Sequence, residues 1–531
     1  MVFIRKSISR GYAYAQLVVT KRIGRRVVHK VIKHLGPWSQ LAEKLIEPTA
    51  SEIKNVMAYD YADIKVIYSL SKELNLIQIL NNNTTKGGGI NVGELSLIII
   101  INHCIDPTSK LQIGKWFSRT YLPSLLKISH DKADKNSLTR VLDYLTEERI
   151  TRIETQIAKQ LENLFKLNNE CLMYDITSTY VYGNNCEIAK HGYNRDHVPE
   201  KQINFGLILS KIGKFPLMHK VFTGNTVDVT TIRSTADDIK KQLNINSCML
   251  ILDRGMISED NLIYLDEEVR YGYIAGLSKA WKTTQELILE AKNFKLIGKE
   301  KQIYAEEGIR LHNGKKKKYV VFLSKEKQKD DKERRERILR EKESELNRLK
   351  ERIGKGKIKN RDKIVMKIGE ITKDARKYFN IKHDKNKLDF DCYLNELVLA
   401  KENKLDGKYA VCCTDVNMSA EEILLAYRDK DKAEKAFRCI KCFIKVRPIR
   451  HWIDNRVKAH IFLCILAYLL QKVLEYKLEI KKLKITAQEA LNELSGIKMI
   501  SYKIGDKFID KVTKIDEKQK LILEKLGYWP I

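Results

Sequence analysis

The sequence has few of the features that mark secreted and membrane proteins. The N-terminus carries early positive charge but no apolar signal segment, so we expect no secretory signal. The most apolar run, residues 461–470 (IFLCILAYLL), is well short of the roughly 20 residues that span a bilayer, and it predicts a buried helix. Ten cysteines fall without framework spacing, which favours reduced thiols in a cytoplasm. Cys439 and Cys442 form a single CxxC without a second pair, which gives little support to a zinc or redox site.

Acidic residues are also scarce relative to basic ones. The 531 residues include 98 Lys and Arg against 68 Asp and Glu, which gives a formal net charge of +30. Such an excess favours a polyanion, because each neutralised phosphate releases counterions. Charge favours nucleic acid but does not by itself separate it from an acidic membrane surface. With 43% hydrophobic residues the composition is that of a folded protein, and its length suggests about three domains or one catalytic domain with large additions.

Residues 1–166 predict a small basic sheet followed by helices. Residues 12–36 form two runs of strand-forming residues around the turn RIGR, which predicts a basic β-hairpin within residues 1–50. Helical spacing begins near residue 51, residues 81–89 (NNNTTKGGG) have linker composition, and residues 92–166 are mostly helical. Residues 136–161 fit either a helix-turn-helix or a plain helical bundle.

Residues 167–280 predict a sheet of short apolar strands. Residues 170–183 (ECLMYDITSTYVYG) predict a strand that leads into Asp175, and residues 247–257 (SCMLILDRGMI) predict a short buried strand that ends at Asp253. Two more strands are predicted in residues 203–224, and another in residues 271–278. Together they predict a central mixed sheet that presents two carboxylates at strand ends or just past them.

Residues 281–420 leave this pattern. A strand at 319–324 precedes a highly charged segment, 325–376, whose apolar residues recur at steps of 7, 3 and 4. This spacing predicts a helical hairpin, either a solvated coiled element or an arm that contacts DNA. A last strand is predicted at 408–415 (KYAVCCTD).

Asp175 and Asp253 are candidate metal ligands. Each follows an apolar run, and a charge presented by a buried strand is costly unless it has a partner. Two such carboxylates on neighbouring strands would repel each other, and a divalent cation such as Mg²⁺, which prefers hard oxygen ligands, resolves that repulsion. The alternative is structural, with Asp253 capping the turn DRGM and Asp175 capping the loop before TST.

The segment 427–441 (YRDKDKAEKAFRCIK) predicts a helix with two stripes. Steps of 3, 4, 4 and 3 place five polar residues on one stripe: Tyr427, Lys430, Glu434, Arg438 and Lys441. The adjacent stripe is apolar and is expected to pack against the sheet: Ala433, Phe437, Ile440 and Ile444. A carboxylate among three cations and a phenol suits a third metal ligand beside phosphate-binding groups, but a salt-bridged surface helix has the same spacing.

These residues resemble a known family. Tyr427, Lys430, Glu434 and Lys441 reproduce the Y-x2-R-x3-E-x6-K spacing of bacterial insertion-sequence transposases of the IS-four type, with Lys430 where the family has Arg. Residues 174–183 (YDITSTYVYG) and 252–258 (LDRGMIS) look like the blocks that carry its first and second Asp. The similarity runs from about residue 1 to about 475, and resembles the branch with a long insertion.

The resemblance implies a fold and an activity. The fold is α/β, an RNase H-like mixed sheet flanked by helices. An insertion domain at 281–420 interrupts this catalytic core, residues 421–476 complete it, and a C-terminal region follows at 477–531. The activity is that of a DDE transposase, in which Asp175, Asp253 and Glu434 hold two Mg²⁺ ions, or Mn²⁺, for DNA cleavage and strand transfer. The resemblance also implies double-stranded DNA as partner, residues 51–166 as the end-binding region, a homodimer at the synapsed ends, and a nucleoid-associated location.

DNA contacts are implied for Tyr427, Lys430 and Lys441, and Arg438 lies on the same stripe. Two basic segments, residues 194–202 and 447–451, contain further candidates for DNA contacts: Arg195, His197, Arg447 and Arg450. The alternative is that both segments are solvated loops that do not contact DNA. Trp452 either packs in the core, which is favoured, or assists distortion of a DNA strand. Two other functions fit the same residues, a non-catalytic DNA-binding protein derived from a transposase and a stand-alone RNase H-like nuclease.

Overall fold

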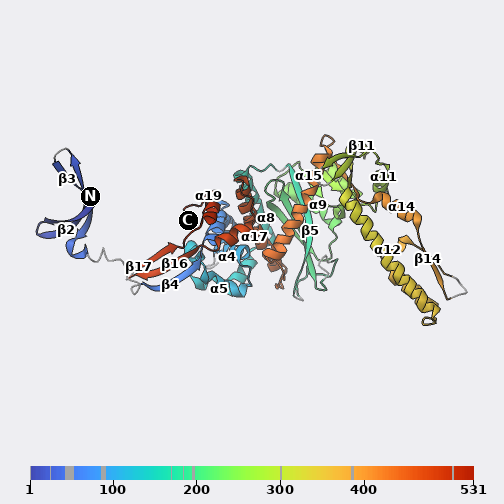
Figure 1. Ribbon diagram of the computed structural model, residues 1–531, viewed down its shortest axis with the longest axis horizontal. Helices are drawn as coiled ribbons and strands as arrows, with labels where there is room; N and C mark the ends of the chain where they lie inside the picture. Colours follow the sequence, from blue (N-terminus) through green and yellow to red (C-terminus); the bar gives the residue numbers. More distant parts are fainter. Residues whose placement is uncertain are drawn as a thin grey trace.

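A large mixed sheet lies at the centre of an elongated molecule (Figure 1). The computed structural model describes residues 2–23, 26–41, 53–84, 91–168, 170–182, 185–193, 198–298, 302–383, 388–504 and 507–531. A small N-terminal sheet lies at one end of the molecule and the long helix α12 (Lys325–Gly354) at the other (Figure 1).

The N-terminal sheet contains three antiparallel strands, one more than predicted. The strands are β1 (Val2–Ser9), β2 (Tyr12–Ile23) and β3 (Arg26–Pro37). β2 and β3 are the predicted hairpin, and the tip of its turn, at 24–25, lies outside the described residues. Among the described side chains of this sheet only Ala15 and Val18 are fully buried, so the described part of both faces is largely open.

The next region is helical, as predicted, except at its start. The helices are α2 (Ala62–Glu73), α3 (Leu76–Asn83), α4 (Val92–Ile105), α5 (Lys110–Arg119), α6 (Leu122–Leu126), α7 (Lys135–Tyr144) and α8 (Glu147–Phe165). The helical prediction from residue 51 is wrong for β4 (Ile53–Asp60), which pairs with β16 (Lys498–Ile504), itself paired with β17 (Lys507–Val512). The linker predicted at residues 81–89 also begins later than predicted, because α3 continues to Asn83.

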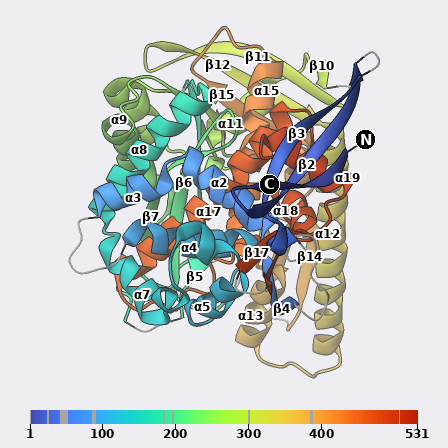
Figure 2. The same cartoon turned by 90° about the vertical axis from the view of Figure 1, so that its left-hand side faces the viewer.

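The predicted buried helix is α17 (Asp454–Ile480), the central helix of this region. Among the described residues it is the one helix long and apolar enough to cross a membrane, but 89% of its apolar window is buried inside the protein. It packs against α2, α4, α7 and α8, and Figure 2 shows these helices gathered around it. Its apolar residues are therefore explained by the core.

Buried Asp63, in the first turn of α2, gives the fold a testable pH dependence. Burial raises the pKa of Asp63 to about 6, and the nearby Asp60 charge adds to this. Because the pKa is higher in the folded than in the unfolded chain, the stability contributed by the protonated form is lost as the pH rises from about 4 to about 6. We expect Asp63→Asn to raise the free energy of unfolding at pH 8 by about 3 kcal/mol, with little difference at pH 4. Urea unfolding of both proteins across this pH range is the measurement, and equal stability at pH 8 would contradict it.

The central sheet has nine strands in the order β10-β11-β12-β15-β9-β8-β5-β6-β7. The first half of the core supplies β5 (Cys171–Tyr180), β6 (Gln202–Ser210), β7 (Pro216–Thr223), β8 (Met249–Leu252) and β9 (Gly272–Gly276). β8 is parallel to β5 and β9, and the other pairs are antiparallel, so the sheet is mixed as predicted.

Part of the predicted insertion belongs to this same sheet. The strands are β10 (Lys295–Gly298), β11 (Ile303–His312), β12 (Lys315–Ser324) and β15 (Lys408–Cys413), and β15 pairs directly with β9. The part of the predicted insertion that lies outside the sheet is shorter than predicted and spans residues 325–405. It contains α12, α13 (Arg361–Thr372), β13 (Phe379–His383), β14 (Phe390–Leu394) and α14 (Glu396–Leu405). These elements enclose a small core of their own, which includes Leu346, Leu349, Ile364 and Ile368.

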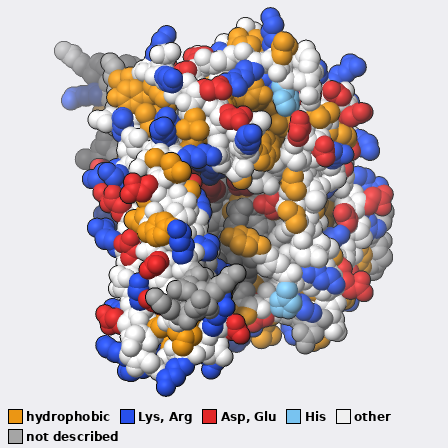
Figure 3. All heavy atoms as spheres, turned by 90° about the vertical axis from the view of Figure 1, so that its right-hand side faces the viewer, with side chains coloured by type: hydrophobic (Ala, Val, Ile, Leu, Met, Phe, Trp, Pro, Cys, Tyr) orange, Lys and Arg blue, Asp and Glu red, His pale blue; other side chains and the backbone are white. Residues whose placement is uncertain are grey.

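The charged helical hairpin is present as α12 and α13. Some charges of α12 pair one turn apart along its surface, such as Lys329 with Glu333 and Lys332 with Glu336. Figure 3 shows Lys, Arg, Asp and Glu interspersed on this end of the molecule. Residues 325–376 nevertheless keep 20 Lys and Arg against 12 Asp and Glu, so the solvated element and the DNA-contacting arm both stay predictions.

Candidate active site

Asp175 and Asp253 lie level with each other on neighbouring parallel strands. The register of β5 and β8 pairs Met173 with Ile251, and each Asp follows two residues later. Because side chains alternate along a strand, the two carboxylates point to the same face of the sheet. Asp253 directly follows its strand, as predicted, whereas Asp175 lies within β5, because pairing with β6 continues that strand to Tyr180.

The two carboxylates are held in different ways. Asp175 is only 4% exposed, and its Oδ1 accepts a hydrogen bond from the backbone N–H of Ile176 at 2.8 Å. Asp253 Oδ1 accepts a hydrogen bond from Lys430 Nζ at 2.7 Å. Burial pushes the pKa of Asp253 up, but the Lys430 hydrogen bond and charge, with the contribution of Arg254, bring it below its usual value. Asp253 is therefore ionised at neutral pH.

Lys430 serves as the counter-ion of this site. Burial alone would lower the pKa of Lys430, but the Tyr427 phenol, the hydrogen bond to Asp253 and the charges of Asp253 and Asp175 raise it. The ammonium also lies 5.5 Å from the centre of the Tyr427 ring, on which it rests as a cation–π pair. A positive charge at this point is what the two aspartates need.

Tyr427 reaches the site because Gly276 leaves room for it. Tyr427 lies on α15 (Ala420–Arg428), and a Cβ on Gly276, the last residue of β9, would overlap its hydroxyl oxygen. Burial raises the pKa of Tyr427, so the phenol keeps its proton. The close approach of helix and strand requires glycine at this position.

The predicted helix at 427–441 is interrupted only near Asp429, between α15 and α16 (Lys430–Arg438). The Asp429 carboxylate accepts hydrogen bonds from Lys214 at 2.8 Å and Lys432 at 2.7 Å. A π-helical turn, η8 (Cys439–Phe443), then carries Lys441. The predicted apolar stripe is buried against the core: Ala433, Phe437, Ile440 and Ile444.

α16 crosses the sheet on the face that bears both aspartates. At its start Lys430 contacts Asp253 of the β8 end, and near its end the Phe437 ring meets Phe205 of β6 at 5.5 Å. Phe205 pairs with Thr177, which is on the same face of β5 as Asp175. Glu434 lies one turn beyond Lys430, on the stretch of α16 that passes over β5, and is exposed.

The three carboxylates are not drawn together as a closed metal centre. Among the described residues, one group of three His, Cys, Asp or Glu has its ligand atoms within 4.8 Å of one another, and it does not include them. In this arrangement Asp253 is paired with Lys430.

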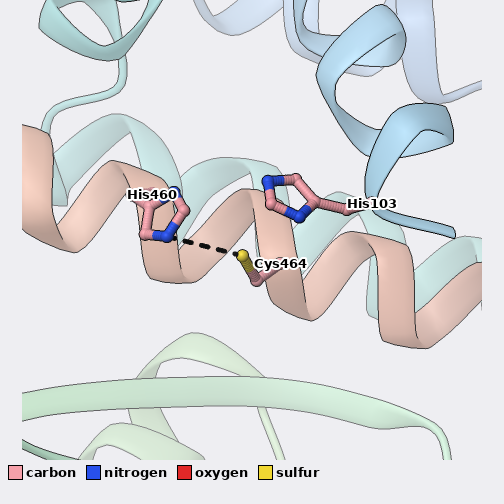
Figure 4. Close-up of side chains that lie close together, drawn as sticks. All are labelled: His103, His460 and Cys464. Atoms are coloured by element: carbon pink, nitrogen blue, oxygen red, sulfur yellow. Dashed lines mark hydrogen bonds between the residues drawn. The ribbon is translucent and has the colours of Figure 1, made fainter. Parts of the chain in front are cut away.

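The group that does converge is His103, His460 and Cys464, where α4 meets α17 (Figure 4). His103 Nδ1 donates to the Ile444 carbonyl at 2.7 Å, and His460 Nε2 donates to the Val446 carbonyl at 3.0 Å. Burial raises the pKa of Cys464 to about 12, and both imidazoles already donate to backbone carbonyls. The group therefore packs and satisfies backbone carbonyls.

The remaining predicted DNA contacts are exposed or half-buried, or lie outside the described residues. Arg438 ends α16 and is exposed. The Arg447 guanidinium lies 5.5 Å from the centre of the Tyr180 ring, and Arg450 is exposed. Arg195 and His197 fall in residues 194–197, outside the described residues.

Trp452 corrects one prediction. It was expected in the core but is 63% exposed, because residues 451–453 form the surface turn before α17. Its apolar neighbours in the sequence belong to the helix that follows.

A pocket lined by Ile176 and Thr177, the residues that follow Asp175 in β5, also contains residues that the sequence did not single out. It has a volume of about 290 Å³ and is lined by Thr177, Ser178, Asn204, Asp228 and Gly255, among others. Ser178 Oγ is buried without a hydrogen-bond partner among the described residues.

Comparison with known proteins gives limited information. No family model and no curated relative matches the sequence. The structure is similar to a piggyBac transposase in a synaptic complex with hairpin DNA, with a TM-score of 0.40 and 8% sequence identity over 84% of this chain and 81% of that chain.

Proposed function

We propose that this protein is a DDE transposase, which cuts DNA at the ends of its own insertion sequence and joins the freed ends to target DNA. The observation that carries the proposal is the pair Asp175 and Asp253, level on adjacent parallel strands, with α16 crossing the face to which they point. The net charge of +30 supports a DNA partner. A homodimer that holds two DNA ends is part of the proposal.

The donor set at this site fits Mg²⁺. Carboxylate oxygens are the hard ligands that Mg²⁺ prefers, and the contact of Asp253 with Lys430 indicates a demand for positive charge. Asp175, Asp253 and Glu434 would hold two Mg²⁺ ions, or Mn²⁺ in their place. When bound, the ions supply Lewis-acid activation of the attacking oxygen and of the leaving 3′-oxygen.

The chain's own residues then bind and orient the DNA. Lys430 keeps its proton and offers a compact charge to a phosphate oxygen, without the two-pronged geometry of Arg. Tyr427 supports that ammonium, and Arg438 and Lys441 meet neighbouring phosphates further along the helix. Attack of water on the phosphodiester gives a nick with a free 3′-hydroxyl, and attack of that hydroxyl on a second phosphodiester gives strand transfer.

The position of Tyr427 gives one test of this arrangement. Gly276→Ala places a methyl group where the Tyr427 hydroxyl lies, so the phenol and the adjacent Lys430 must move. We expect Mg²⁺-dependent cleavage of DNA that bears the element's ends to fall by roughly 10- to 100-fold, with a loss of about 1–3 kcal/mol in stability. Gly308→Ala is the matched control, because a Cβ there meets nothing within 4 Å. Unchanged cleavage in Gly276→Ala would remove Tyr427 from the site.

A second candidate is a DNA-binding protein that does not cut. The observation that favours it is the ion pair of Lys430 with Asp253, which satisfies this carboxylate without a metal. Salt-dependent DNA binding, with no cleavage in Mg²⁺ or Mn²⁺, would select this function over the transposase.

A further inference from the structure

A second site is built where α5, α7 and the segment before α17 meet. It is a cavity of about 790 Å³, and none of its described lining residues is Asp or Glu. Its charged lining residues are all basic: Lys110, Lys135, Lys445, Arg447, Arg450 and Arg456. A concave surface with one sign of charge concentrates an anionic ligand.

Lys110 is the cation deepest in this site. Its ammonium donates to His451 Nε2 at 3.2 Å and to His460 Nδ1 at 3.4 Å. Burial lowers the pKa of His451 to about 3 and that of His460 well below its usual value, so both imidazoles are neutral acceptors. Among the described residues no carboxylate pairs with Lys110. Burial lowers the pKa of Lys110 to about 8, so the half-buried ammonium is still mostly protonated at neutral pH, and a bound anion offsets the cost of its partial removal from water.

The rim adds further positive charge and one aromatic ring. Arg456 is neutralised by Asp143, at 2.6 and 2.8 Å. Lys135, Lys445 and Arg450 are exposed and form no ion pair with a described residue. Trp452, 63% exposed, also lines the cavity and presents a ring on which a base can stack.

The cavity lies beyond the end of the strand that carries Asp175. Ile449 bridges to Val181, and the Tyr182 N–H donates to the Ile449 carbonyl at 2.8 Å. Val181 is six residues from Asp175, which at about 3.3 Å per residue is roughly 20 Å along β5. A DNA strand of about six nucleotides spans that distance.

We propose that this cavity binds a phosphate group of a DNA strand through Lys110 and Arg450, with Trp452 stacked on an adjacent base. The identity of the nucleic acid as DNA rests on the proposed function. The positive lining and the uncompensated ammonium are independent of it. A basic cavity with an aromatic rim is the arrangement that holds unpaired strands without reading their sequence.

DNA affinity measured without catalysis tests this site. The full-length protein with Asp175→Asn, in EDTA, is titrated against fluorescent single-stranded and duplex DNA at several salt concentrations. We expect Lys110→Met and Arg450→Ala each to weaken binding by about tenfold at 0.15 M salt and to reduce the salt slope by about 1. Trp452→Ala should weaken binding to the single strand more than to the duplex. Lys115→Met, which removes an exposed charge from the same helix, is the control.

A comparison of DNA with and without a 5′-phosphate identifies which phosphate is bound. If 5′-phosphorylated DNA binds more tightly than 5′-hydroxyl DNA, and Lys110→Met abolishes the difference, the ligand is a terminal phosphate. If the two DNAs bind alike and the variants still weaken both, the ligand is a backbone phosphate. Affinities of Lys110→Met and Arg450→Ala equal to that of Lys115→Met overturn the cavity proposal. Failure of the unsubstituted protein to bind any DNA overturns the proposed function instead.

Discussion

Replacing Asp175 by Asn is expected to reduce Mg²⁺-dependent DNA cleavage by roughly 10⁴-fold, as loss of an essential catalytic group does. The substitution keeps the size of the side chain and an oxygen that can accept the Ile176 N–H, so the strand should be undisturbed. What is lost is one negative charge on the face that α16 covers. DNA binding in EDTA should persist, since it depends on the basic residues.

The measurement is cleavage of a duplex that bears the inverted ends flanking the gene, with purified protein and Mg²⁺ or Mn²⁺. Asp260→Asn is the control, because Asp260 is an exposed carboxylate on the helix that follows Asp253. Cleavage by Asp175→Asn at the rate of Asp260→Asn would remove Asp175 from the chemistry. A parallel fall in thermal stability would show that the change acts through folding, and Asp253→Asn, at a partly exposed position, then provides the second test.

Local sequence patterns were sufficient to locate the strands that carry the two aspartates. The runs CLMY and MLIL are wholly or almost wholly buried, and an apolar run of that length has few alternatives to a core strand. The helix at 427–441 followed in the same way from the spacing of its apolar stripe. In each case the pattern of apolar residues that predicts the element lies within one short segment of the sequence.

Features that depend on distant partners were not predictable. β4 was interpreted as the start of a helical segment, because its partner β16 lies more than 400 residues further along the chain. The junction of β15 with β9, which joins residues 408–413 to the sheet, likewise depends on pairing that no local pattern encodes. The same limit applies to Lys430, whose spacing placed it on the Glu434 stripe but did not reveal its contact with Asp253.

Glu434 provides the sharpest test of the site, because it is exposed and its substitution should not affect folding. We expect Glu434→Gln to reduce metal-dependent cleavage by roughly 10⁴-fold while the free energy of unfolding changes by less than about 0.5 kcal/mol. The physical reason is its place on α16, one turn beyond Lys430, which contacts Asp253, and three residues before Phe437, which contacts Phe205.

Glu421→Gln separates this role from a simple change in surface charge. Glu421 is an exposed carboxylate near the start of α15, thirteen residues before Glu434 and therefore on another side of the helical segment. If the two Gln variants cleave DNA equally well, Glu434 is a surface residue and the stripe at 427–441 is a salt-bridged helix face. If Glu434→Gln alone is inactive, and calorimetry shows weaker Mn²⁺ binding to it than to Glu421→Gln, the carboxylate acts as a metal ligand. Lys430 must then release Asp253 when the metal binds, which frees its ammonium for the DNA phosphate.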